Sequence, residues 1–149
     1  FASMQPTHAT SDMPWAEARL GSARLAGAYA WRTLLDQGAE LVFGSDAPVE
    51  EENPWFGVYA AVTRQDAAGN PVGGWFPEQR LTVQEALSAF SLGAAHAAGD
   101  RELGMIRPGM IADLTVIDRD PETIDPISLR ATKTLRTIVD GREIFVAER

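Results

Sequence analysis

Two polar segments of the chain carry side chains suited to acid, base or metal chemistry. Asp46 follows Ser45 directly after the run Leu41-Val42-Phe43-Gly44, and a carboxylate can bind a divalent cation or accept a proton. His8 follows the short run of residues 1–4, and a histidine can bind a metal, contact a substrate or exchange a proton near neutral pH. Each also has an ordinary interpretation, because Asp46 can cap a turn and a loop histidine can form surface hydrogen bonds. Sequence position alone leaves both interpretations open.

Residues 1–4 and 41–43 are predicted to be the strands that present these side chains. Three consecutive bulky apolar residues at 41–43 indicate a strand buried on both faces, as in a parallel sheet covered by helices. Gly44 is expected to give the backbone freedom at the end of that strand. An apolar face predicts a helix over about residues 23–37, with Ser22 as its N-cap, and thus a right-handed βαβ unit. Ligands and catalytic groups gather at the carboxyl edge of such sheets.

Three polar stretches surround these elements. Residues 5–12 are predicted to form a loop in which Asp12 caps a following turn. The acidic run at 50–52 is expected to be solvated, with the steering of a cation as the alternative. Residues 65–80 contain three glycines and two prolines and are predicted to lack regular structure. Because long loops often cover substrates, Trp75 could line a substrate site, and packing onto the protein itself is the alternative.

The rest of the chain shows clearer local signals. A short helix is predicted over residues 55–64. Thr82 and Glu85 form a capping box, and the apolar positions after it predict one helix that continues to about residue 97. A strand at 111–117 and a hairpin over 135–146, turning at Asp140-Gly141, predict a small β unit at the end of the chain.

Composition excludes several classes of function. Thirteen basic and 21 acidic residues give a net charge of −8, which makes nucleic acid and anionic membranes poor partners. The chain has no cysteine, so disulfides, thiolate metal sites and cysteine nucleophiles are excluded. No apolar run approaches the roughly 20 residues of a membrane span. We therefore expect a soluble protein, with the cytoplasm as its favoured location, and the first residue, Phe1, suggests part of a longer polypeptide.

Several motifs, taken together in their order and spacing, resemble the C-terminal third of a metal-dependent amidohydrolase. They are Phe43-Gly44-Ser45-Asp46-Ala47-Pro48-Val49, Ala94-Ala95-His96-Ala97-Ala98-Gly99, the segment 103–118 that begins Leu103-Gly104-Met105-Ile106-Arg107-Pro108-Gly109, and Val139-Asp140-Gly141-Arg142-Glu143-Ile144-Phe145. The opening segment 3–15, with Gln5-Pro6-Thr7-His8 and Asp12, narrows the resemblance to the amidohydrolase 3 branch, which includes YtcJ-like and N-substituted formamide deformylase-like proteins. The resemblance covers essentially the whole chain.

This resemblance implies an α/β fold made of two parts. Residues 1–102 would be the C-terminal portion of a (β/α)8 TIM barrel, with strand seven at the start of the chain and strand eight at 41–43. Residues 103–149 would be the C-terminal share of a small β-sandwich built from both ends of the parent polypeptide.

The resemblance also implies a site and a reaction. Asp46 would bind a divalent metal, with zinc favoured, and would take a proton from the metal-bound water. The parent protein would then hydrolyse C–N bonds of amide-type, non-peptide small molecules. His8, Ser45 and Trp75 would lie on the substrate side, with Ser45 orienting the loop.

The chain departs from the family pattern in its metal ligands. The family's His-x-His motif and later metal histidines are absent, and the two histidines present are His8 and His96. One aspartate and one histidine cannot make a three-ligand catalytic site. We therefore expect this chain alone to lack a complete metal centre and to be inactive without the missing N-terminal part. Two alternatives stay open: a non-catalytic folding or homo-oligomerisation module, and a complete small α/β protein.

Overall fold

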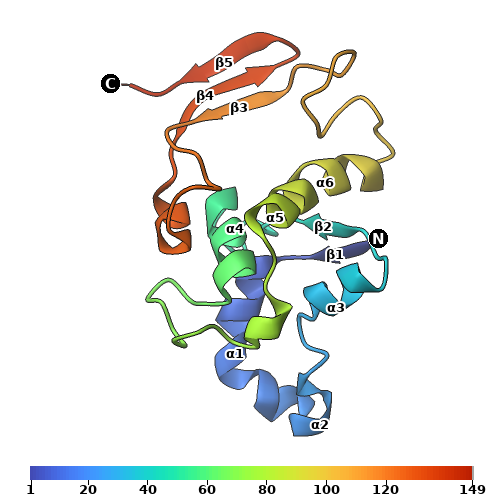
Figure 1. The fold of residues 1–149 in the computed structure, drawn as a ribbon, viewed down its shortest axis with the longest axis vertical. Helices are drawn as coiled ribbons and strands as arrows, with labels where there is room; N and C mark the ends of the chain where they lie inside the picture. The colour runs from blue at the N-terminus through green and yellow to red at the C-terminus, as the bar shows by residue number, and fades with distance from the viewer. Residues whose placement is uncertain (149) are drawn as a thin grey trace.

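A parallel pair of short strands forms the centre of the structure, a computed structural model that describes residues 1–148 (Figure 1). Strand β1 (Ala2–Met4) pairs with β2 (Leu41–Phe43), with Ala2 opposite Leu41 and Met4 opposite Phe43. Leu41 and Phe43 are buried. The predicted parallel pairing of these two strands is therefore confirmed, and the strands end at the same level.

The connection between these strands differs from the prediction. It contains α1 (Pro6–Leu20), α2 (Ser22–Leu25) and α3 (Trp31–Asp36). The predicted loop at 5–12 is wrong, because Pro6 occupies the first turn of α1, where a proline has no hydrogen bond to lose. The predicted continuous helix at 23–37 is also wrong. Its middle is a turn in which Tyr29 adopts a φ of 52°, and Ser22 is the first residue of α2 and not its N-cap.

Three further helical segments and a one-turn η1 follow β2. They are α4 (Pro54–Thr63), η1 (Pro77–Gln79), α5 (Val83–Phe90) and α6 (Leu92–Ala97). The Asn53 side chain caps α4 by accepting a hydrogen bond from the Trp55 amide at 3.0 Å. The capping box at the start of α5 is confirmed. The single helix predicted to residue 97 is interrupted at Ser91, whose φ of −118° and ψ of −81° are not helical.

A three-stranded antiparallel sheet forms one end of the molecule (Figure 1). Its order is β3 (Leu114–Ile117), β4 (Thr134–Val139) and β5 (Arg142–Val146), and η2 (Pro126–Ala131) precedes β4. The predicted hairpin turn is confirmed, with φ of 51° at Asp140 and 71° at Gly141. The strand expected at 111–117 begins at Leu114. Strand β5 lies at the sheet edge with all five of its residues exposed.

Aromatic side chains connect the parallel strands to the helices. Trp31 is fully buried, and its ring centroid lies 5.9 Å from that of Phe43. The ring centroid of Phe43 in turn lies 5.6 Å from that of Phe90 in α5. Such edge-on aromatic pairs add to the stabilisation from buried apolar area. Within residues 1–148 no helix is both long enough and apolar enough to cross a bilayer.

The capping box of α5 also carries a charge that should make stability depend on pH. The Glu85 carboxylate accepts hydrogen bonds from the Thr82 amide at 2.8 Å and from the Arg32 guanidinium. The bond from Arg32 is the largest cause that lowers the pKa of Glu85 from its usual 4.5. A lowered pKa in the folded state stabilises the fold above pH 4.5, and this stabilisation is lost as the pH falls through the folded-state pKa.

We therefore expect Glu85→Gln to lower the free energy of unfolding by about 1 kcal/mol at pH 7 and to flatten its decline in acid. Glutamine can still cap the helix, so the change isolates the charge. Urea denaturation between pH 7 and pH 3 measures both effects, with Glu52→Gln as an exposed control. Identical pH slopes for wild type and Glu85→Gln would contradict this prediction.

Candidate active site at the carboxyl edge of the parallel strands

The level ends of β1 and β2 bring two chain segments to one edge of the parallel pair. Helix α1 begins two residues after Met4. Residues 44–53, here called the Asp46 loop, leave β2 directly after Phe43 and lead to α4. Because parallel strands share the same carboxyl edge, the segments with His8 and Asp46 start side by side.

Asp46 is exposed and has a left-handed backbone, with φ of 56°. Its carbonyl accepts a hydrogen bond from the Val49 amide at 2.8 Å, which closes a tight turn. Gly44 was predicted to supply the backbone freedom here, but the positive φ lies at Asp46. Asp and Asn adopt this conformation more readily than most residues, and such strain is common at functional sites.

His8 and Ser45 flank this edge from the two segments. His8 lies in the first turn of α1, half-buried, and its Nε2 atom is buried without a hydrogen-bond partner among residues 1–148. The neighbouring Thr7 Oγ1 is in the same state. Ser45 is half-buried beside Asp46. The structure therefore places three of the four predicted site residues on the segments that leave this edge.

Trp75, the fourth predicted residue, packs against the protein itself. Its ring lies 6.2 Å from the Tyr29 ring and 5.1 Å from the Arg64 guanidinium carbon. Arg64 is fully buried, and its guanidinium carbon lies 4.2 Å from the centroid of the Trp31 ring. Its Nε atom donates a hydrogen bond to the Trp75 carbonyl at 2.7 Å. Burial lowers the pKa of Arg64 to about 10. These contacts match the packing interpretation, and a substrate contact of Trp75 stays a prediction.

Two side-chain pairs near this edge were not predicted. Ser11 Oγ donates to Glu50 Oε1 at 2.7 Å, which joins α1 to the Asp46 loop. The Tyr29 hydroxyl donates to the Asp12 carboxylate. Asp12 lies inside α1, so the prediction that it caps a turn is wrong. Recognising Pro6 as the first turn of a helix would have put His8, Ser11 and Asp12 on neighbouring positions of one helix face.

The described residues do not by themselves fit a metal ion. Within residues 1–148 no group of three or more His, Cys, Asp or Glu side chains lies close enough to hold one. A catalytic zinc site takes three protein ligands and one open position. Asp46 can offer one carboxylate, and the other ligands would have to come from outside this set of residues.

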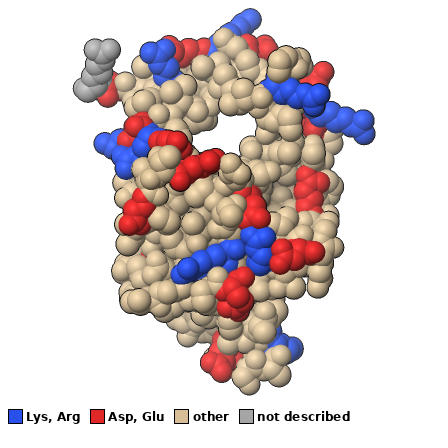
Figure 2. Space-filling view, viewed as in Figure 1, with Lys and Arg blue, Asp and Glu red and all other residues tan. Residues whose placement is uncertain are grey.

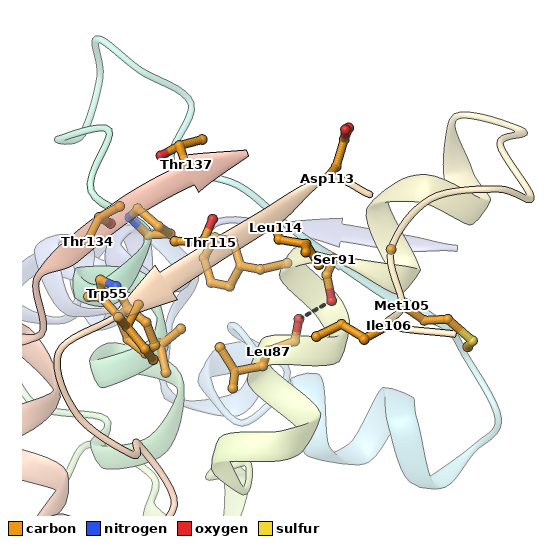
Figure 3. Close-up of a pocket in the computed structure, with 15 residues that line it drawn as sticks. Trp55, Leu87, Ser91, Met105, Ile106, Asp113, Leu114, Thr115, Thr134 and Thr137 are labelled. Atoms are coloured by element: carbon orange, nitrogen blue, oxygen red, sulfur yellow. Dashed lines mark hydrogen bonds between the residues drawn. The ribbon is translucent and has the colours of Figure 1, made fainter. Parts of the chain in front are cut away.

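A cavity of about 530 Å³ lies elsewhere, between the helices and the antiparallel sheet (Figure 3). Trp55, Leu87 and Ile106 form part of its apolar wall (Figure 3), and Thr115 of β3 and Thr137 of β4 also line it. Figure 2 shows an opening through the molecule between the sheet and the helical part. None of His8, Ser45, Asp46 or Trp75 lines this cavity, so it is separate from the carboxyl edge.

Comparison with known proteins links this arrangement to one family. The model of the amidohydrolase family, in its amidohydrolase 3 branch, matches residues 1–145. Putative amidohydrolase YtcJ from Bacillus subtilis is 34% identical over 143 residues, which are 95% of this chain and 27% of the relative. N-substituted formamide deformylase from Arthrobacter pascens is 38% identical over 111 residues, which are 74% of this chain and 20% of the relative.

A solved structure agrees with these sequence matches. An uncharacterized metal-dependent hydrolase from Pyrococcus horikoshii OT3 superimposes with a TM-score of 0.72 at 31% identity, covering 83% of this chain and 25% of that one. The chain thus spans about a quarter of the length of the relatives it matches. The family match covers residues 1–145, which include both parallel strands and nearly all of the antiparallel sheet. The chain therefore belongs to the amidohydrolase family.

Proposed function

We propose that this chain is part of a metal-dependent hydrolase that cleaves C–N bonds of amide-type, non-peptide small molecules. The proposal rests chiefly on Asp46, a carboxylate in a left-handed turn at the carboxyl edge of two parallel strands. Family membership supports hydrolase chemistry, and the printed name of one relative, N-substituted formamide deformylase, supports an amide-type bond.

In this proposal β1 and β2 are strands seven and eight of a (β/α)8 barrel. Residues 1–102 then belong to the barrel and residues 103–149 to a small β-sandwich. Asp46 contributes one carboxylate to a metal site whose other ligands lie on other barrel strands, with zinc as the favoured metal. Such a metal, when bound, would supply an activated water. The Asp46 carboxylate would accept the proton that the attacking water loses and would pass it to the leaving nitrogen. His8 and Ser45 contact the substrate from the two flanking segments, and Trp75 closes the apolar side.

Metal analysis of two purified polypeptides tests this proposal. We expect stoichiometric zinc or another divalent metal in a longer polypeptide that contains this chain and the family's histidine motifs. We expect substoichiometric metal in the 149-residue chain, because it offers fewer than three ligands. A longer polypeptide that hydrolyses amides after its metal has been removed would overturn the proposal.

A second candidate function is a non-catalytic module for folding or self-association. The observation that favours it is the exposed edge strand β5, on which Ile144 is 65% exposed and Val146 is 53% exposed. Unpaired sheet edges readily add another strand. Light scattering of the 149-residue chain tests the self-association. A stable dimer, together with a longer polypeptide that binds no metal, would favour the module. A monomer would exclude self-association through β5.

A further inference from the structure

The Asp46 loop is tied to the rest of the structure at a point beyond Asp46 itself. We propose that Glu50 and Tyr29 are positioning residues that fasten this loop, through α1, to the buried Arg64. The proposal rests on the catalytic role proposed for Asp46. It concerns how that carboxylate is held, and neither Glu50 nor Tyr29 is one of the four predicted site residues.

The first link joins the loop to α1. Glu50 comes one residue after Val49, whose amide closes the turn on the Asp46 carbonyl. The Glu50 carboxylate accepts the Ser11 hydroxyl at 2.7 Å. Pairing of Phe43 with Met4 fixes the near end of the loop, and the bond to Ser11 fixes the far end of the turn. Asp46 thus lies between two attachment points.

The second link joins α1 to the protein interior. Asp12, next to Ser11, accepts the Tyr29 hydroxyl. The Tyr29 carbonyl accepts a hydrogen bond from Arg64 Nη1 at 2.9 Å, and the Tyr29 ring packs on Trp75. Arg64 is fully buried, so Tyr29 connects α1 to a side chain in the protein interior.

The surroundings of the Tyr29 hydroxyl keep it protonated, so that it can donate a hydrogen bond. Burial is the largest cause that raises the pKa of Tyr29 well above 10, followed by the hydrogen bond to Asp12, and the charge of Glu50 adds to the shift. The hydroxyl therefore stays protonated and can donate to Asp12 throughout the physiological range. The two links meet in α1, because Ser11 and Asp12 are consecutive residues of that helix.

This fastening explains how an unfavourable backbone can persist at Asp46. A left-handed conformation of a non-glycine residue costs about 1 kcal/mol or more and is kept only where surrounding contacts require it. Glu50 and Ser11 supply such a requirement at one end of the turn. Without them, the turn is expected to open and the Asp46 carboxylate to sample several directions.

Amide hydrogen exchange on the 149-residue chain tests the first link, with the Val49 amide as the reporter. We expect Ser11→Ala and Glu50→Ala to speed exchange at Val49 about tenfold or more, while urea denaturation shows the global fold retained. Glu50→Gln should restore slow exchange, since its amide oxygen can accept the same bond. Glu51→Ala, a change at an exposed neighbour, is the matched control. Tyr29→Phe, which removes the hydroxyl and keeps the ring on Trp75, should speed exchange in the same direction.

Unchanged exchange in both Ser11→Ala and Glu50→Ala would overturn the proposal. So would equal exchange in Glu50→Ala and Glu50→Gln, because the effect would then come from charge and not from the hydrogen bond. In a longer, active polypeptide, Glu50→Ala should lower kcat with little change in KM, and Glu50→Gln should restore it. Hydrogen exchange is measured without any enzymatic turnover. Full activity of an Asp46 variant would therefore refute the proposed function, but it would not affect the conclusion from the exchange experiment.

Discussion

Replacing Asp46 by asparagine in a longer, active polypeptide is expected to lower kcat by about 10²- to 10⁴-fold, the range typical for loss of a general acid or base. The amide cannot accept a proton at neutral pH, and it is a weaker metal ligand than a carboxylate. KM for the substrate should change much less, because Asp46 is proposed to act on the reacting atoms and not on the rest of the substrate.

Asparagine is chosen because it should change the chemistry of residue 46 without disturbing the fold of the turn. Asp46 has a φ of 56°, and asparagine, like aspartate, adopts that conformation readily, whereas alanine would strain the turn. Glu51→Gln removes one charge from the same loop at an exposed position and should leave kcat unchanged. Steady-state kinetics and circular dichroism of both variants measure activity and fold. Unchanged turnover in Asp46→Asn would refute the role assigned to this carboxylate.

Replacing Gly93 by alanine is expected to destabilise the fold by about 3 kcal/mol, at the upper end of the usual cost of overpacking. Gly93 lies in α6, and a Cβ atom there would come within 2.1 Å of the Leu41 carbonyl oxygen. Leu41 belongs to β2 and is paired with Ala2, so its backbone cannot move without breaking the parallel pair. Helix α6 must shift instead.

Gly44→Ala is the matched control, because Gly44 follows the other end of β2. Nothing lies within 4 Å of a Cβ atom at Gly44, and its φ is not positive. We expect a change below about 1 kcal/mol for this control. For Gly93→Ala we expect a fall in melting temperature of roughly 10 °C for a chain of this size. Thermal and urea denaturation measure both variants, and equal stability of the two would contradict the close approach of α6 to β2.

Local sequence signals predicted those elements whose stability is local. The capping box at Thr82 and the Asp140-Gly141 turn were predicted because each depends on a few neighbouring residues. The parallel pair was predicted because residues 41–43 are uniformly apolar. Helix α1 was missed, since its one serine, two threonines and two prolines favour a loop locally. Its contacts with α4 and with Tyr29 come from distant parts of the chain.

Of the candidate site, too, the sequence predicted only the part that depends on neighbouring residues. Asp46 could be singled out because it directly follows a buried strand. The ties that hold its loop could not, because Ser11 and Glu50 are 39 residues apart and Asp12 and Tyr29 are 17 apart. The break of the helix at Ser91 also has no sequence signal that we can identify. Pairings across such separations depend on how the elements pack, which a single sequence does not reveal.

The exposed strand β5 has a consequence for handling the protein in solution. Ile144, Phe145 and Val146 form a short apolar, proline-free run on an edge strand, and such runs are prone to aggregation. Arg142 and Glu143 precede this run as charged gatekeepers. The net charge of −8 adds repulsion between molecules. High salt weakens that repulsion and strengthens apolar association, so precipitation with salt should begin at this strand before the helical part unfolds.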